Sequence, residues 1–134
     1  MIPKTHKVVL IDDNAIFRMV FGAIFTKSEK LNMDYACYEN ALDALDGLKS
    51  NYSSHSEYPD YLFVDINMPY MTGWELMDKI KEEDYAFLQN CTIFIISSSS
   101  LDSDTQNIHQ YPFIKDYILK PVSKEKLMDL LASP

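Results

Sequence analysis

The sequence predicts an α/β protein in which helices cover both faces of a doubly wound, five-stranded parallel sheet. Five short apolar runs alternate with segments whose apolar residues recur every three or four positions, the spacing of amphipathic helices. Most of the runs are contiguously apolar, as in strands that are buried on both faces. Strands connected by helical crossovers lie parallel. No repeat or linker divides the sequence, so residues 1–134 are expected to form one domain.

The N-terminal half contains the first two strands and the first two helices of this pattern. Strands are predicted at residues 7–11 and, on a weaker pattern, at residues 34–38. Between them a helix is predicted from Ala15 to residues 26–29, on the helical spacing of Ile16, Phe17, Val20, Phe21, Ile24 and Phe25. Asn40 can cap the second helix, whose apolar stripe is Ala41, Leu42, Ala44, Leu45 and Leu48.

A polar segment at residues 50–59 is predicted to be a surface loop. It leads into a buried strand at residues 61–65. Thr72 and Glu75 then have the spacing of a capping box, and they predict a helix that runs to about Asp84.

The last two strands are predicted at residues 92–96 and 116–119, with a weakly patterned helix at about residues 103–110 between them. Ser123 can cap a final helix. The inward side of that helix consists of Leu127, Met128, Leu130 and Leu131.

The chain is acidic, with a formal net charge of −8 and a sequence pI of about 4.7. This charge opposes the phosphates of nucleic acids and anionic membranes, so we expect no direct binding to either. The sequence shows no signal pattern and no apolar run of transmembrane length. A cytoplasmic location is therefore expected.

The cysteines and histidines give no sign of a metal or catalytic site. Cys37 and Cys91 lie in apolar segments without CxxC spacing, so both are expected to be buried free thiols. His6, His55 and His109 lie in terminal or loop-like positions with no shared spacing, and they are expected to be solvated.

Polar side chains follow four of the five predicted strands. Asp12 and Asp13 follow the first strand, Asp65 ends the third, four serines follow the fourth, and Lys120 follows the fifth. In a parallel sheet these positions lie along one edge, where such sheets bind ligands. Each has an ordinary explanation alone, since a strand-ending Asp can start a turn and a run of Ser can be a solvated loop. Their joint occurrence favours a functional site.

Three carboxylates at one edge repel one another unless a cation joins them. Oxygen ligands with open positions suit Mg²⁺, and the backbone carbonyl of Asn67 is expected to complete the protein ligands. An Asp in such a site can also act as a nucleophile and form an aspartyl-phosphate. Lys120 and a Ser hydroxyl would then stabilise the charge on the phosphoryl oxygens.

Over nearly its whole length the chain resembles a response regulator receiver domain of the stand-alone kind. The resemblance is carried by Asp12-Asp13, by Asp65-Ile66-Asn67-Met68-Pro69 with Gly73, by the hydroxyl after the fourth strand, and by Tyr117-Ile118-Leu119-Lys120-Pro121. It implies a flavodoxin-like fold, a phosphoryl acceptor at Asp65, and Mg²⁺ carboxylates at Asp12 and Asp13. It also implies contact between Lys120 and the phosphoryl group, and a cis peptide before Pro121.

The same resemblance implies a two-state switch. Its switch hydroxyl falls on Ser97, with Ser98 as the alternative, and its aromatic switch residue falls on Tyr117. A sensor histidine kinase or a histidine phosphotransfer protein would transfer a phosphoryl group from His to Asp65. The hydroxyl and Lys120 would then move inward, and Tyr117 would change the surface that a downstream target protein binds. The chain is thus expected to be a signalling protein and not an enzyme.

Other classes of protein fit only part of the pattern. A phosphatase of the haloacid dehalogenase type needs a second Asp two residues after its nucleophile, where this chain has Asn67, which cannot transfer a proton. A flavin-binding protein with a similar sheet needs neutral donors in the first loop, where this chain has Asp12 and Asp13. A receiver-like binding module that is never phosphorylated would not need the acceptor residues, all of which are present.

Overall fold

One parallel sheet lies at the centre of the fold. The structure is a computed structural model, and it describes residues 6–27, 33–49, 59–83, 90–98 and 102–132. In these residues five parallel strands form a sheet in the order β2-β1-β3-β4-β5. The strands are β1 (His6–Ile11), β2 (Met33–Tyr38), β3 (Tyr61–Asp65), β4 (Thr92–Ser97) and β5 (Ile114–Leu119).

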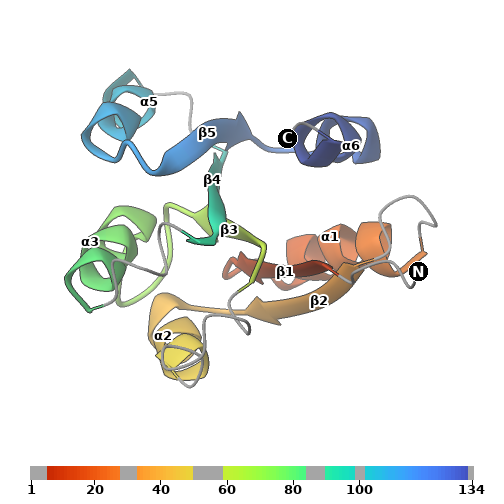
Figure 1. The fold of residues 1–134 in the computed structure, drawn as a ribbon, viewed down its shortest axis with the longest axis horizontal. Helices are drawn as coiled ribbons and strands as arrows, with labels where there is room; N and C mark the ends of the chain where they lie inside the picture. Colours follow the sequence, from red (N-terminus) through yellow and green to blue (C-terminus); the bar gives the residue numbers. More distant parts are fainter. Residues whose placement is uncertain (1–5, 28–32, 50–58, 84–89, 99–101, 133–134) are drawn as a thin grey trace.

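Helices cover both faces of this sheet (Figure 1). One face packs against α1 (Ala15–Lys27) and α6 (Lys124–Ala132). The other packs against α2 (Ala41–Lys49), α3 (Gly73–Glu83), and the turn that follows α5 (Asp102–Asn107). The chain winds outward from β1 in both directions, which confirms the predicted doubly wound, flavodoxin-like α/β fold.

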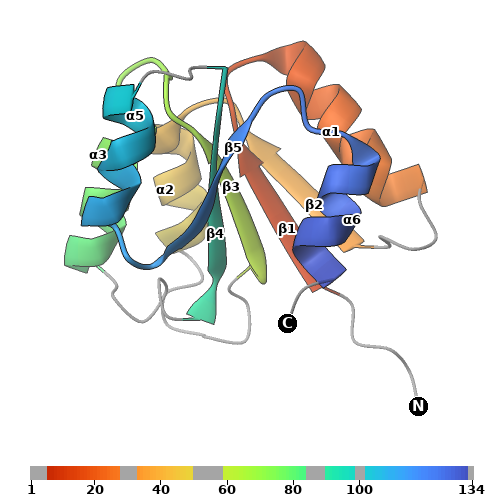
Figure 2. The ribbon, with the colours of Figure 1, turned by 90° about the horizontal axis from the view of Figure 1, so that it is seen from above.

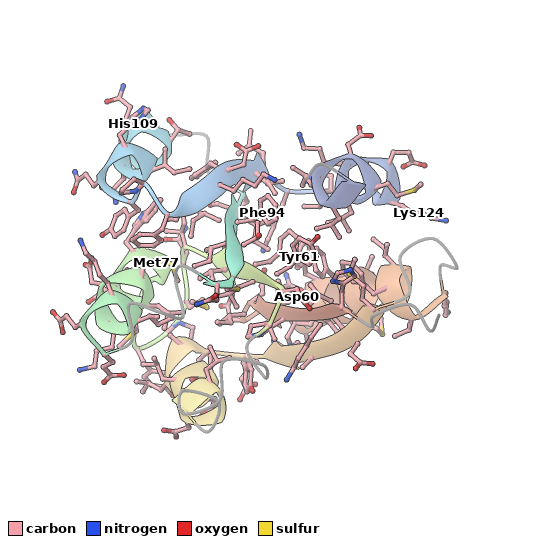
Figure 3. The ribbon with its side chains drawn as sticks, viewed as in Figure 1. Asp60, Tyr61, Met77, Phe94, His109 and Lys124 are labelled. Carbon is pink, nitrogen blue, oxygen red and sulfur yellow. The ribbon has the colours of Figure 1, made fainter. Side chains whose placement is uncertain are left out.

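The two faces of the sheet are packed with different side chains. On the α1–α6 face the rings of Phe63 and Phe94 stack with centroids 4.9 Å apart, and Phe21 meets Phe63 edge-on at 5.0 Å. The opposite face is filled mainly by aliphatic side chains and by Met77 of α3. Figure 3 labels Phe94 beside β4 and Met77 on α3. Because both faces are buried, most of the strands are contiguously apolar.

Three predicted helix caps are confirmed. Asn40 Oδ1 accepts the backbone N–H three residues later at 2.8 Å, at the start of α2. Thr72 and Glu75 make the two reciprocal bonds of a capping box, at 3.0 and 3.1 Å, before α3. Ser123 Oγ accepts a backbone N–H of α6 at 3.0 Å. These side chains satisfy N–H groups that have no partner within their helices.

The boundaries differ from prediction mainly in the C-terminal half. Ser97 is the last residue of β4, and β5 starts at Ile114 rather than at residue 116. Ile114 is buried and pairs in register with Ile93, so it belongs to the strand. The weakly patterned segment is the short helix α5 followed by a 3₁₀ turn at Ile108–Gln110.

The prediction that Cys37 is buried is wrong. Cys37 is exposed because it lies on β2, which is at the edge of the sheet, and no local pattern identifies an edge strand. Cys91 is buried just before β4, as predicted, and both thiols are free. In the helices, three residues of the expected apolar stripes, Ile16, Val20 and Leu42, are 71%, 54% and 46% exposed.

The histidines that the structure describes lie at the surface. His6 begins β1, and its Nδ1 lies 3.6 Å from Asp60 Oδ2, which also accepts the Lys7 N–H at 2.8 Å. His6 is therefore exposed, as expected, but it also faces a carboxylate. His109 is exposed on the turn after α5 (Figure 3).

Some predictions lie outside the described residues. These are His55, nearly all of the surface loop at residues 50–59, and the expected end of a helix at Asp84. Within the described ranges, no helix is both long enough and apolar enough to cross a membrane.

Candidate functional site

All five strands run toward the same edge of the sheet (Figure 2). Three carboxylates meet at that edge. Asp12 and Asp13 directly follow β1, and Asp65 is the last residue of the neighbouring strand β3. One carboxylate oxygen from each residue lies within 4.8 Å of the others. Asp12 is fully buried and Asp65 is 5% exposed, whereas Asp13 is exposed, so the cluster is open to solvent on one side. The structure therefore brings the three predicted metal carboxylates together.

Lys120 places its ammonium group against this cluster. Its Nζ lies 2.7 Å from Asp12 Oδ2 and 3.9 Å from Asp65 Oδ2. Its backbone N–H donates to the carbonyl oxygen of Ser97 at 2.8 Å, which connects the end of β5 to the end of β4. The peptide between Lys120 and Pro121 is cis, as the resemblance implies.

The environment of the site shifts the pKa of the Asp65 carboxyl group. The pKa of Asp65 is raised from 3.8 to about 7, mainly because the carboxyl group is buried and further because Asp12 and Asp13 repel its charged form. The ammonium of Lys120 and the backbone N–H of Ile66 act in the opposite direction. Without a bound cation, Asp65 is therefore expected to be only partly ionised near neutral pH. A cation that joined the carboxylates would favour the charged form and lower this pKa.

The oxygen atoms of the cluster fit a hard divalent cation. Asp12 Oδ1 accepts the Asn14 N–H at 2.8 Å, but among the described residues its buried Oδ2 accepts no hydrogen bond. Lys120 Nζ lies 2.7 Å from this oxygen and forms an ion pair with it, but the angles of the contact are not those of a hydrogen bond. Lys120 compensates one negative charge, but three carboxylates share the site, so a further positive charge would stabilise it. Carboxylate oxygens that are open to solvent on one side match Mg²⁺, which keeps part of its water shell.

The fourth expected ligand group is less defined. Asn67 is exposed in the loop that follows β3. Its position two residues after Asp65 is compatible with the predicted role of its carbonyl, and that role stays a prediction.

The two predicted switch residues lie on the same face of the sheet. Ser97 is fully buried at the end of β4, whereas Ser98 is exposed, which favours Ser97 as the switch hydroxyl. Side chains alternate along a strand, so Ser97 faces the same side as Ile95. Ile95 is the register partner of Tyr117, which is half-buried and packs against the core on that face.

A comparison with known proteins identifies the family. The family model for the response regulator receiver domain matches residues 8–132. The chain belongs to this family. It is therefore a receiver domain of the kind found in phosphorelay response regulators, as predicted.

Proteins of different length contain domains similar to this one. The domain is 28% identical over 128 residues to the chemotaxis protein CheY of Treponema pallidum, covering 96% of this chain and 81% of that protein. It is 32% identical over 124 residues to the DNA-binding transcriptional regulator NtrC of Proteus hauseri, covering 92% of this chain but 23% of that protein. The crystal structure of a two component response regulator from Cytophaga hutchinsonii shares the fold, with a TM-score of 0.85, 24% identity, and coverage of 97% of this chain and 96% of that one.

The receiver domain holds the backbone of Asp65 tightly against α3. The Gly73 N–H donates to the carbonyl oxygen of Ile66 at 2.8 Å. A Cβ atom on Gly73 would lie 2.6 Å from the carbonyl oxygen of Asp65, so only glycine fits this position without a shift. In the loop between them Tyr70 has a φ of 72°, a left-handed conformation that is strained for a bulky residue. The loop that follows Asp65 is thus sterically constrained.

Three further residues touch the receiver site, and the sequence did not predict them. Asn14 caps α1, since its Oδ1 accepts the Phe17 N–H at 2.9 Å. Arg18 Nη1 donates to the carbonyl oxygen of Asp12 at 2.7 Å. The Phe17 ring lies below Lys120, with Nζ 4.4 Å from the ring centroid. The cap could have been found from the Asn that precedes a helix, but the other two contacts depend on the tertiary fold.

Proposed function

We propose that Asp65 accepts a phosphoryl group from a phosphohistidine of a sensor histidine kinase or a histidine phosphotransfer protein, in the presence of Mg²⁺. The observation that supports this most directly is the position of Asp65 within 4.8 Å of two other carboxylates and 3.9 Å from the Lys120 ammonium. The exposed side of the cluster gives a donor protein access. The net charge of −8 favours a protein over a nucleic acid as the downstream partner.

The transfer needs an ionised acceptor and a way to neutralise phosphoryl charge. A carboxylate oxygen of Asp65 attacks phosphorus, the phosphorus–nitrogen bond breaks, and its electron pair returns to the imidazole nitrogen of the donor. Lys120 Nζ can then bond an oxygen of the transferred group after a small movement. Asp12 and Asp13 would hold Mg²⁺, which when bound supplies positive charge beside the phosphoryl oxygens.

Phosphorylation then changes the binding surface. The new oxygens attract the Ser97 hydroxyl and Lys120, and Tyr117 moves on the same face of the sheet. This alters the surface made by α5, β5 and α6, where a target protein binds in the cytoplasm. Phosphorylation acts as a ligand that favours one of two conformations, and a shift from about 1:99 to about 99:1 requires about 5.5 kcal/mol.

The proposal can be tested with a small phosphodonor. Wild-type protein incubated with acetyl phosphate and Mg²⁺ should gain one phosphoryl group by intact-mass spectrometry, and the adduct should be stable to acid and labile to alkali. Asp65→Asn should gain none. Asp129→Asn, which removes an exposed carboxylate on α6, is the matched control and should react like the wild type. A wild-type protein that gains no group, or an adduct that persists in Asp65→Asn, would contradict the proposal.

Two further measurements complete the test. A purified phosphohistidine donor should transfer its label to Asp65 faster than acetyl phosphate does, since protein docking orients the reactants. We also propose that the protein does not turn over phosphate esters. Release of inorganic phosphate from such esters in large excess over the protein would indicate a phosphatase instead.

A further inference from the structure

Lys120 is held by two residues before any phosphoryl group is present. Its Nζ makes the 2.7 Å ion pair with Asp12. Nζ also lies 4.4 Å from the centroid of the Phe17 ring, the geometry of a cation–π contact. The Lys120 side chain is only 18% exposed, so little water competes for the ammonium. Asp65 Oδ2 is the next acceptor within reach, at 3.9 Å.

These contacts form a closed frame of four residues. Asp12 Oδ1 accepts the Asn14 N–H at 2.8 Å, and Asn14 Oδ1 accepts the Phe17 N–H at 2.9 Å. The Phe17 ring contacts Lys120, which returns to Asp12 through the other carboxylate oxygen. The first turn of α1 therefore fixes the ring relative to the same carboxylate that binds the lysine.

The Phe17 ring also packs against the aromatic core. Its centroid lies 5.5 Å from that of Phe21, and Phe21 meets Phe63 of the central strand β3 at 5.0 Å. Phe21 is 1% exposed and Phe63 is fully buried, so this row is part of the close-packed interior. Phe17 is partly buried and packs against this row, which limits its movement away from Lys120.

We propose that Phe17 is a positioning residue for Lys120. A lysine ammonium is a point charge on a flexible four-carbon stem, and one ion pair does not define its direction. The Phe17 ring limits the directions that the ammonium can take and keeps Nζ beside Asp12 and Asp65. Phe17 thereby raises the fraction of molecules in which Lys120 can meet an incoming phosphoryl oxygen. The inference rests on the proposed function for its effect on rate, but its geometry can be tested independently.

The first test uses the wild-type protein without any phosphodonor. Protons on the ε-methylene of Lys120 should be shielded by the ring current of Phe17, so their NMR signal should lie upfield of the other lysine ε-methylenes. Phe17→Leu should return this signal to the ordinary lysine position, whereas Phe17→Tyr should retain the shift. An unshifted wild-type signal would overturn the inference whether or not the protein accepts phosphate.

The second test measures the rate of phosphorylation by acetyl phosphate at saturating Mg²⁺. Phe17→Leu should slow it about threefold to tenfold, a range between the values for an exposed and a fully desolvated cation–π contact. Phe17→Tyr should react at nearly the wild-type rate. Phe25→Leu is the matched control, because it removes a buried ring from the same helix, and it should leave the rate unchanged.

Two results would overturn the role in positioning. One is a wild-type rate in Phe17→Leu. The other is equal slowing in the Leu and Tyr variants, which would indicate packing alone. If the wild type itself does not react, the proposed function fails, and the NMR comparison still decides whether Phe17 directs the lysine.

Discussion

Asp65→Asn should make the protein more stable at alkaline pH when divalent cations are absent. The structure raises the pKa of Asp65 from 3.8 to about 7, so the folded state binds a proton more tightly than the unfolded chain does. For a carboxyl group with a raised pKa, the free energy of unfolding falls as pH rises between these two values. Replacing the carboxyl by a neutral amide removes this loss.

The size of the effect follows from the same shift. Each pKa unit corresponds to about 1.36 kcal/mol, so a shift from 3.8 to about 7 sets an upper limit of about 4 kcal/mol. Asp13 is exposed, and solvent screens part of the repulsion within the cluster. The expected gain in the free energy of unfolding is therefore about 1–2 kcal/mol at about pH 8, and close to zero at about pH 4.

Urea unfolding in the presence of a chelator measures this difference. The curves of wild type and Asp65→Asn should separate as pH rises from about 4 to about 8, while Asp129→Asn should follow the wild type throughout. Added Mg²⁺ should stabilise the wild type more than Asp65→Asn, because a ligand that binds only the folded state raises its stability. A variant less stable than wild type at the alkaline end would refute the reasoning about charge repulsion.

Three further outcomes follow from the structure. At low Mg²⁺, the rate of modification by acetyl phosphate should rise as pH increases through about 7, because only ionised Asp65 reacts. Saturating Mg²⁺ should move the midpoint of this pH profile to lower pH. A rate that does not change with pH would contradict the raised pKa of Asp65. Gly73→Ala should lower the free energy of unfolding by about 1–3 kcal/mol in thermal or urea unfolding, because the added Cβ overlaps the carbonyl oxygen of Asp65. Unchanged stability would show that the loop relaxes freely. Trp74 is the single tryptophan, and its ring stacks on that of Tyr111 with centroids 5.2 Å apart. Its fluorescence should change when beryllofluoride and Mg²⁺ are added, and Tyr111→Leu should reduce that change. An identical fluorescence response in the variant would exclude the stacked pair as the source of the change.

Local sequence patterns predicted the parts of the fold that local chemistry determines. Contiguous apolar runs located the strands because both faces of the sheet are covered, and Asn40, Thr72 and Ser123 located helix starts because each side chain satisfies a nearby N–H. The acidic cluster could also be predicted, since strand ends that carry Asp12 and Asp65 must share one edge in a parallel sheet.

What could not be predicted depends on contacts between distant segments. Cys37 is exposed because β2 lies at the edge of the sheet. The order of the strands in the sheet could not be predicted from the short apolar segment around Cys37. The contact of Phe17 with Lys120 joins the first helix to the last strand, so the helical spacing around Phe17 indicated only core packing. Ile16 and Val20 satisfied that spacing too, yet they are exposed, because the apolar pattern around α1 is wider than the face that the sheet covers.

The two sheet faces are packed with different side chains, so we expect one side of the molecule to be stiffer and the other to be more compliant. Interlocked phenylalanine rings under α1 and α6 have few alternative arrangements. On the opposite face aliphatic side chains and the flexible Met77 fill most of the core, although Trp74 and Tyr111 also stack there. Ser97 and Tyr117 face the compliant side. A rearrangement that starts at the carboxylate cluster should therefore spread through one layer of helices and leave the other as a fixed frame of reference.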